Sequence, residues 1–373
     1  MTNVLAVAVD AALVDRITAI RDHRVVSIGR ENVDAIRADV PFHPDLILIG
    51  DGLTPEQATR YAQRVLSEYP SMVIALVAEP DRDRIREATH AGMRGVISNA
   101  ISDHELANLI ARAGASAPVD AITGGLHQVI VVASPKGGVG KTTVSVNLAA
   151  LLAERSPGAV VLLDLDLQFG DVSSVVDLQP EFTAAEAFDS GAADSMLLRT
   201  LLTPHPAGFH ILCGADHPAA AGPVTGDQVR KLVRQFANDF QYVVVDTSAG
   251  MQEETLASLE EATDVAFVGT MDVATLRNLR KEIDVLAELG LLPERRHLVL
   301  NRMDRFSGLT QRDAENIVGM HADALIPAAA NIPLAANHGR LAIQERKRNK
   351  MRQPLEKFVR AISAQTRRGG KHL

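Results

Sequence analysis

Short apolar runs alternate with amphipathic stretches along most of this chain, and the alternation divides into two series. In the first series the apolar runs have the length of strands, and apolar residues at helical spacing lie between them. The predicted strands are 4–9, 24–28, 46–50, 73–78 and 95–98. Strand–helix units in this succession predict a parallel sheet covered by helices on both faces.

The second series begins at residue 128 and follows the same alternation. Its predicted strands are 128–133, 160–165, 242–245, 265–269, 297–300 and 324–326, and its clearest helices are 142–155 and 276–289. Residues 114–126, between the two series, are mostly small and include glycine and proline, which is typical of a linker. We therefore predict an α/β chain with one domain over 1–113, a linker over 114–126, and a second domain over 127–373 whose sheet is mostly parallel and flanked by helices.

Composition narrows the class of protein without identifying it. Hydrophobic residues make up 46% and charged residues 23% of the 373 positions, as in ordinary soluble domains. No apolar run reaches the roughly 18–20 residues that span a bilayer, and the first run is too short and lacks the basic flank of a signal peptide. Cys213 is the only cysteine, which excludes a disulfide framework and a cysteine-ligated metal centre within one chain. We expect a cytoplasmic protein.

Charge is unevenly distributed along the chain. The net charge is −8, yet residues 339–373 hold eleven Lys/Arg and two Glu, which gives +9 for this segment and −17 for the remainder. An acidic body argues against broad nucleic-acid affinity, whereas a basic tail favours an anionic surface or partner. Four apolar residues of the tail recur at helical spacing: Leu355, Phe358, Val359 and Ile362. We weigh a membrane-surface helix against a last helix packed on the second domain, and we favour packing because one short stripe fits ordinary core burial.

A glycine-rich string lies between the predicted strand 128–133 and the predicted helix 142–155. Its residues are Lys136, Gly137, Gly138, Val139, Gly140, Lys141, Thr142 and Thr143. Glycines let the backbone wrap a phosphate, and amides at a helix N-terminus supply donors and a positive dipole. In such a P-loop Lys141 would reach the β- and γ-phosphates, and the Thr142 hydroxyl would bind Mg²⁺. The string therefore predicts a site for ATP and Mg²⁺, although Pro135 stands where the usual pattern has glycine and alters the entry to the loop.

Two later strands end in carboxylates, at the edge of a parallel sheet where ligands bind. The strand 160–165 leads into Asp164 and Asp166, and Asp246 follows the strand 242–245. Apolar residues followed by an acid form a Walker B pattern, so Asp246 is predicted to hold Mg²⁺ through water, with Asp164 assisting in the outer shell of the metal. A single acid after a strand is more often a turn residue, but acids on two strands in this order after a P-loop favour function.

The P-loop string, with its additional lysine at the start, resembles the deviant Walker A motif of the MinD/ParA ATPases, and the resemblance covers about 128–373. It implies that Lys136 crosses a dimer interface to the partner's nucleotide and that Asp166, in switch I, orients the attacking water. It also implies that the amide of Gly250, in switch II, senses the γ-phosphate and that Asn301, after the strand 297–300, contacts the adenine edge. As an ordinary turn residue, Asn301 would need no such role.

The first predicted domain resembles a flavodoxin-like response-regulator receiver that has lost its phosphorylation chemistry. Gly50 stands at the position of the acceptor aspartate, Val77 where receivers have Thr or Ser, and Asn99 where they have lysine. Only Asp10 represents the usual acidic pair, and Asp51 would replace the acceptor only if the register were shifted by one. Phosphoryl transfer to this domain would therefore lack its nucleophile and its charge stabilisation.

A degenerate receiver joined to a MinD-like ATPase resembles the CpaE/TadZ proteins, which localise the assembly machinery of Flp/Tad type IV pili. The resemblance implies a slow ATPase that forms a homodimer through its nucleotide face and lies in the cytoplasm, at the inner membrane or at a cell pole. Its receiver-like domain would bind a protein partner of a pilus, secretion or division machine. Three alternatives stay open: a septum-site-determining regulator, a ParA-like partitioning ATPase, and a nucleotide-stabilised scaffold with negligible hydrolysis.

Overall fold

A computed structural model describes most of the chain. It covers residues 2–20, 23–30, 44–69, 72–79, 84, 87–88, 91–113, 127–168, 170–189, 195–214, 224–304, 306–345 and 350–369. The chain forms two compact units, one of residues 1–122 and 193–200 and the other of residues 123–192 and 201–373. The predicted linker 114–126 lies outside the described residues, so the domain boundaries stay a prediction.

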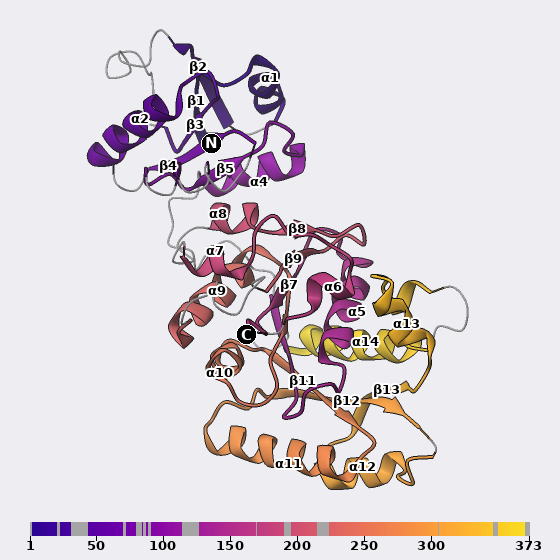
Figure 1. The fold of residues 1–373 in the computed structure, drawn as a ribbon. Coiled ribbons are helices and arrows are strands. Elements are labelled where there is room, and N and C mark those ends of the chain that lie inside the picture. Colours follow the sequence, from indigo (N-terminus) through magenta and orange to yellow (C-terminus); the bar gives the residue numbers. More distant parts are fainter. Residues whose placement is uncertain are drawn as a thin grey trace. The chain divides into compact units, whose positions relative to one another are not determined.

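The N-terminal unit is a parallel sheet of five strands in the order β2-β1-β3-β4-β5 (Figure 1). The strands are β1 Thr2–Val7, β2 His23–Ile28, β3 Leu46–Ile49, β4 Val73–Val77 and β5 Gly95–Ile97. The helices of this unit are α1 Ala11–Ala19, α2 Pro55–Glu68, α4 Asp103–Ala113 and α8 Ser195–Thr200. This strand order is that of flavodoxin-like sheets, so the predicted fold is confirmed.

The carboxyl edge of this sheet is closed by backbone packing. The strand predicted over 4–9 ends at Val7 because Ala8 adopts a left-handed conformation, with φ of 52°. The turn brings Ala8 against Gly50, where a Cβ would overlap the Ala8 carbonyl oxygen and lie 2.5 Å from the Cα of Val9. Only glycine fits at position 50 without a backbone shift, so an acceptor aspartate has no room there.

The second unit contains a sheet of eight strands in the order β13-β12-β11-β6-β10-β7-β9-β8. Its strands are β6 Gln128–Ala133, β7 Val160–Asp164, β8 Thr203–Pro204, β9 His210–Leu212, β10 Tyr242–Asp246, β11 Asp264–Thr270, β12 Arg295–Met303 and β13 Ala322–Pro327. All pairs are parallel except β8 with β9. The mostly parallel sheet was predicted, whereas the short strands β8 and β9 were not.

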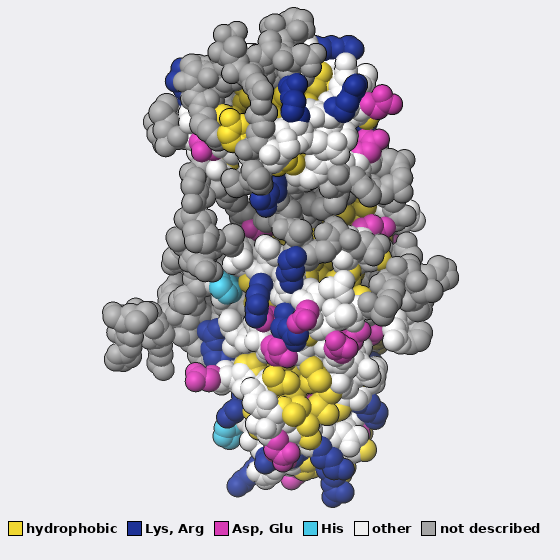
Figure 2. All heavy atoms as spheres, turned by 90° about the vertical axis from the view of Figure 1, so that its left-hand side faces the viewer, with side chains coloured by type: hydrophobic (Ala, Val, Ile, Leu, Met, Phe, Trp, Pro, Cys, Tyr) yellow, Lys and Arg dark blue, Asp and Glu magenta, His cyan; other side chains and the backbone are white. Residues whose placement is uncertain are grey.

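Helices cover the sheet of the second unit (Figure 1). They are α5 Lys141–Ala153, α6 Val172–Val175, α7 Ala184–Asp189, α9 Gly226–Asp239, α10 Glu253–Glu260, α11 Val273–Glu288, α12 Gln311–Val318, α13 Asn331–Asn337, the 3₁₀ helix η3 Ala342–Gln344 and α14 Arg352–Gly369. On the face shown in Figure 2, basic and acidic side chains are interspersed. Ion pairs of Arg230 with Glu260 and of Arg234 with Glu261 join α9 to α10.

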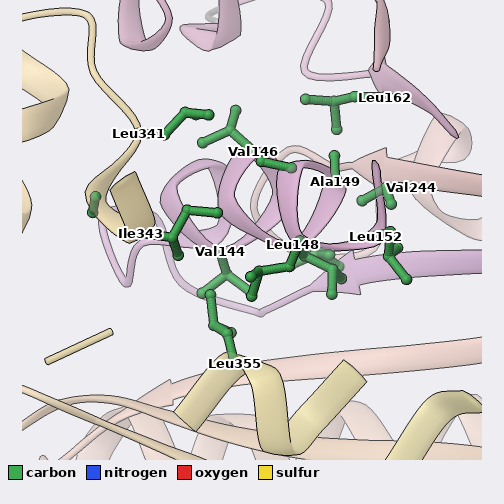
Figure 3. Packing of buried hydrophobic residues seen from close by; sticks show 14 of the residues in the cluster. Val144, Val146, Leu148, Ala149, Leu152, Leu162, Val244, Leu341, Ile343 and Leu355 are labelled. Atoms are coloured by element: carbon green, nitrogen blue, oxygen red, sulfur yellow. The ribbon is translucent and has the colours of Figure 1, made fainter. Parts of the chain in front are cut away.

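The helix that follows the P-loop is buried on nearly all sides. From Val144 to Ala153, every residue of α5 is buried. Figure 3 shows why: Leu162 of β7 and Val244 of β10 lie on the sheet side of α5, while Ile343 of η3 and Leu355 of α14 pack on it from other elements. A helix packed all round is held firmly by apolar burial, so the loop at its N-terminus has a rigid support.

The C-terminal helix α14 contributes to this core. Its apolar stripe, predicted from helical spacing, is fully buried: Leu355, Phe358, Val359 and Ile362 each have 0% exposure. The stripe therefore packs on the second unit, as favoured from the sequence, and the alternative of a membrane-surface helix resting on these four residues is wrong. In the part of the chain that the structure describes, none of the helices combines the length and the hydropathy of a membrane-spanning segment.

Candidate functional site

The P-loop connects β6 to α5 through two left-handed glycines. Gly138 and Gly140 have φ values of 72° and 98°, which other residues adopt only with strain. Gly140 occupies the N-cap position of α5 and offers no side chain to cap it. The first amides of α5 are therefore available to a ligand, and together with the helix dipole they favour an anion such as phosphate.

Asn301 supports this loop from the end of β12. Its Nδ2 donates to the carbonyl of Val139 over 2.7 Å, and its Oδ1 accepts from the amide of Arg302 over 2.9 Å. A Cβ on Gly140 would overlap the Nδ2 of Asn301 and displace this amide, and the positive φ of Gly140 itself favours glycine at this position. The structure thus places Asn301 at the predicted site, where it braces the loop backbone; its contact with adenine stays a prediction.

The two predicted metal-site acids are neighbours across strands. Asp164 ends β7 and Asp246 ends β10, and they are register partners in this parallel pair. Each is only 1% exposed. Burial raises the pKa of Asp246 to about 6, although hydrogen bonds from Thr142 and Ser145 and the charge of Lys141 oppose the rise. Burial, and then the charge of Asp246, raise the pKa of Asp164 well above its ordinary value.

The surroundings of these acids fit a divalent cation. Ser145 Oγ lies 2.8 Å from Asp246 Oδ1 and 3.0 Å from the carbonyl of Lys141, which aligns the carboxylate with the first turn of α5. Thr142, hydrogen-bonded to Asp246, adds a hydroxyl oxygen beside it. Hydroxyl and carboxylate oxygens are the ligands that Mg²⁺ prefers, and a cation would offset the cost of burying two adjacent carboxylates.

Asp166 lies just beyond the end of β7, partly exposed. Its amide donates to Asp164 Oδ1 over 3.2 Å, and the amide of Val172 donates to Asp164 Oδ2 over 3.4 Å. The charge of Asp166 contributes to the raised pKa of both Asp164 and Asp246. The three predicted acids are therefore close enough to interact, and Asp166 is the most accessible of them.

Lys136 and Gly250 are engaged with their own chain. Lys136 Nζ donates to Thr275 Oγ1 over 3.2 Å and lies 3.7 Å from Asp272 Oδ1. The amide of Gly250 donates to the carbonyl of Ser134 over 3.0 Å. A contact of this amide with a γ-phosphate would require that bond to be exchanged, so its sensing role stays a prediction.

Sequence reasoning missed four residues at this site: Ser145, Asp272, Thr275 and Glu282. Ser145 could have been found as the residue one helical turn after Lys141. Glu282 of α11 is 3% exposed, and neither carboxylate oxygen has a hydrogen-bond partner among the described residues. Burial raises its pKa to about 7 against the opposing charge of Lys141. No local pattern marks Glu282, because its proximity to Lys141 arises only in the folded sheet.

Comparisons with known proteins identify the family and the fold of the second unit. The family model of ParA, described as an NUBPL iron-transfer P-loop NTPase, matches residues 125–362. The septum site-determining protein MinD of Synechocystis is 24% identical over 230 residues, which cover 60% of this chain and 84% of that protein. A ParA family ATPase from Chlorobium tepidum superposes with a TM-score of 0.59 at 20% identity, covering 62% of this chain and 98% of that one. MinD from Pyrococcus horikoshii, solved with Mg-ADP, superposes with a TM-score of 0.56 at 23% identity, covering 63% of this chain and 96% of that one.

Proposed function

Because the chain belongs to the ParA family of P-loop NTPases, we propose that it is a nucleotide-switched ATPase that binds ATP with Mg²⁺, dimerises through its nucleotide face and positions a machine of the cell envelope. The observation that carries this proposal is the buried pair Asp164 and Asp246, set beside an uncapped P-loop helix. Two adjacent buried carboxylates are costly even with Lys141 near Asp246, and the Mg²⁺ ion of a Mg-nucleotide would supply further positive charge.

Each side chain has a defined part in this proposal. Lys141 and the first amides of α5, including those of Thr142 and Thr143, bind the phosphates, and Asp246 with Thr142 holds the metal, which neutralises charge on the phosphates. Asp166 orients water for attack on the γ-phosphate. Because the chemistry consists of positioning and charge stabilisation, a slow turnover that reports the nucleotide state is expected.

Hydrolysis is tested by steady-state phosphate release from the full chain. Asp166→Ala is expected to lower the rate about 100-fold, in the range of one positioned catalytic group. Asp171→Ala, which removes an exposed acid of the same segment, is the matched control and should leave the rate unchanged. Equal rates for the wild type and Asp166→Ala would instead favour the nucleotide-stabilised scaffold.

Dimerisation is tested by sedimentation with a slowly hydrolysed ATP analogue and Mg²⁺. We expect the wild type to dimerise and Lys136→Ala to stay monomeric, since Lys136 is proposed to reach the partner's nucleotide. Lys281→Ala, which removes an exposed lysine of α11, is the control. A Lys136→Ala protein that dimerises like the wild type would contradict this part of the proposal.

For the cellular role we propose localisation of Flp/Tad pilus assembly, as in CpaE/TadZ proteins. The supporting observation is a flavodoxin-like unit joined to a ParA-family unit, in which Gly50 leaves no room for an acceptor aspartate. Such a unit suits constitutive binding of a protein partner better than a phosphorylation switch. We place the protein in the cytoplasm, with peripheral attachment at the inner membrane or a pole through its partner.

A septum-site regulator is the second candidate, favoured by the similarity to MinD of Synechocystis. A deletion strain separates the two, with surface pili and cell length as readouts. Loss of pili at normal cell length supports the pilus role, whereas minicells or filaments with intact pili support the septum role. An iron-carrier role is not proposed, because Cys213 is the only cysteine and is buried.

A further inference from the structure

The ammonium group of Lys136 is held inside its own subunit. It donates to the hydroxyl of Thr275, and it forms an ion pair with Asp272. The side chains of Lys136 and Asp272 are about half exposed, at 51% and 45%, whereas Thr275 is fully buried. The contact therefore joins the long side chain of Lys136 to a hydroxyl group that is fixed in the core.

The acceptor side of this contact is rigid. Asp272 caps α11, because its Oδ1 accepts from the amide of Thr275 over 2.8 Å, and its Oδ2 accepts from the hydroxyl of Thr270 over 2.7 Å. Partial burial disfavours its charge, but these hydrogen bonds and Lys136 bring its pKa down to about 2. Asp272 is therefore ionised throughout the physiological range.

The sheet brings the two halves of the contact together. Lys136 follows β6, and Asp272 follows β11; these strands are parallel neighbours, so both segments leave the same edge. One ammonium group cannot occupy this position and also reach a nucleotide in a second subunit. We propose that Asp272 and Thr275 are positioning residues that hold Lys136 in its own subunit, so that ATP-dependent dimerisation must break this contact and is weakened by it. This inference rests on the proposed dimerisation through Lys136.

Two substitutions release Lys136 with little change elsewhere. Asp272→Asn removes the charge, while asparagine remains a good N-cap. Thr275→Val replaces the hydroxyl with a methyl group and keeps the shape of the side chain nearly the same. In sedimentation with a slowly hydrolysed ATP analogue, each is expected to tighten the dimer about two- to thirtyfold, because a dimer breaks one contact in each subunit and a partly exposed ion pair contributes about 1.4- to 5-fold. Asp284→Asn, which removes the partner of Arg280 on the same helix, is the matched control.

A double-substitution cycle separates positioning from a structural effect. In the Lys136→Ala background, which is expected to be monomeric, Asp272→Asn should not restore dimerisation, and it should leave the affinity of the monomer for ATP unchanged in either background. If Asp272→Asn promoted dimerisation without Lys136, its effect would be on the structure of α11 rather than on Lys136, and that result would overturn the inference.

Acylation of lysines in the protein without nucleotide, read by mass spectrometry, tests the contact independently of dimerisation. Asp272→Asn should speed labelling of Lys136 relative to Lys281, since the side chain of Lys136 is then no longer held by the ion pair with Asp272. Unchanged labelling overturns the contact, and faster labelling with an unchanged dimer overturns its role in dimerisation. If labelling is faster but the wild type does not dimerise with nucleotide at all, the proposed function fails, and with it the role of the contact.

Discussion

The carboxyl edges of the two parallel sheets use their polar groups in different ways. At the N-terminal sheet, Asp10 is exposed and accepts from the amide of Ala12 over 2.7 Å as the cap of α1. Ala8 and Gly50 fill the remaining space with backbone. At the second sheet, Asp164 and Asp246 are 1% exposed and lie side by side next to the P-loop.

An exposed cap stabilises its own helix and costs little, whereas a buried pair of acids is costly until a cation neutralises it. The same kind of sheet edge therefore holds only an exposed cap and packed backbone in one unit, and a buried pair of acids beside the P-loop in the other. Strand order places side chains at the edge, but burial and charge decide whether they form a site.

The comparison is tested most strongly by placing an acid at position 50, where the backbone of Ala8 leaves no space for a side chain. Gly50→Asp would overlap the backbone of Ala8 and is expected to lower the free energy of unfolding by about 3–4 kcal/mol. Thermal unfolding of the full chain measures this, with Asp51→Ala, an exposed neighbour, as the control. A stable Gly50→Asp protein that accepts a phosphoryl group from acetyl phosphate would show that the edge is not closed.

The amino edge of the second sheet offers a third case, in which buried charged groups neutralise one another. His297 is 2% exposed; its Nε2 lies 3.2 Å from Asp264 and its Nδ1 lies 3.5 Å from Asp323. Burial alone would lower the pKa of His297, but hydrogen bonds and charge from the two acids outweigh it and raise the pKa to about 9. The proton is therefore bound more tightly in the folded state.

Because the folded pKa of His297 lies above the ordinary value, its stabilisation is complete below about pH 6.5 and is lost as the pH rises through about 9. We expect the free energy of unfolding in urea to fall by roughly 3 kcal/mol over this window. His297→Gln should remove most of that dependence without changing ATP binding at pH 7. A wild type whose stability is flat from pH 6.5 to 10 would contradict the assignment.

At the binding edge, Asp246→Asn removes the acid proposed to hold the metal. The gain in ATP affinity on adding MgCl₂ should fall about 10- to 100-fold, as for water-mediated metal partners, with Asp284→Asn as the control. In the wild type the same gain should decline below about pH 6, because protonation of Asp246 competes with the cation. An Asp246→Asn protein with the full magnesium effect would exclude this acid from the metal site.

The smallest expected effect concerns the support of Asp246. Ser145→Ala removes a buried hydrogen bond of 2.8 Å to this carboxylate and should weaken Mg-ATP binding by about 1 kcal/mol. Ser258→Ala is a matched control, since Ser258 is an equally buried helix serine whose hydroxyl bonds only to backbone carbonyls. Equal losses for both variants would indicate a general effect on stability rather than support of the site.

Local patterns were sufficient to predict most of the fold. The capping box of Thr54 and Gln57 with Pro55 at the first helical position is confirmed, and the predicted strand 128–133 has the bounds of β6. β8 and β9 were missed because they are short and lie outside the regular alternation of strands and helices, which had indicated the equally short β5. The P-loop string could be recognised because its chemistry is contiguous in the sequence.

Contacts between distant segments could not be predicted in the same way. The ion pair of Lys136 with Asp272 and the hydrogen bond from Asn301 to Val139 join positions more than 130 residues apart. Such contacts depend on the order of strands in the sheet, which periodicity does not determine. The residues of the site were thus identifiable by type and strand position, whereas their partners required the structure.

Titration calorimetry of the full chain with ATP and MgCl₂ measures directly whether the P-loop site binds a nucleotide. We expect saturable binding of one ATP per chain for the wild type and loss of that binding in Lys141→Ala, with Lys281→Ala unchanged. A wild type that gives no binding heat at several temperatures, or a Lys141→Ala protein that binds as well as the wild type, would contradict this expectation.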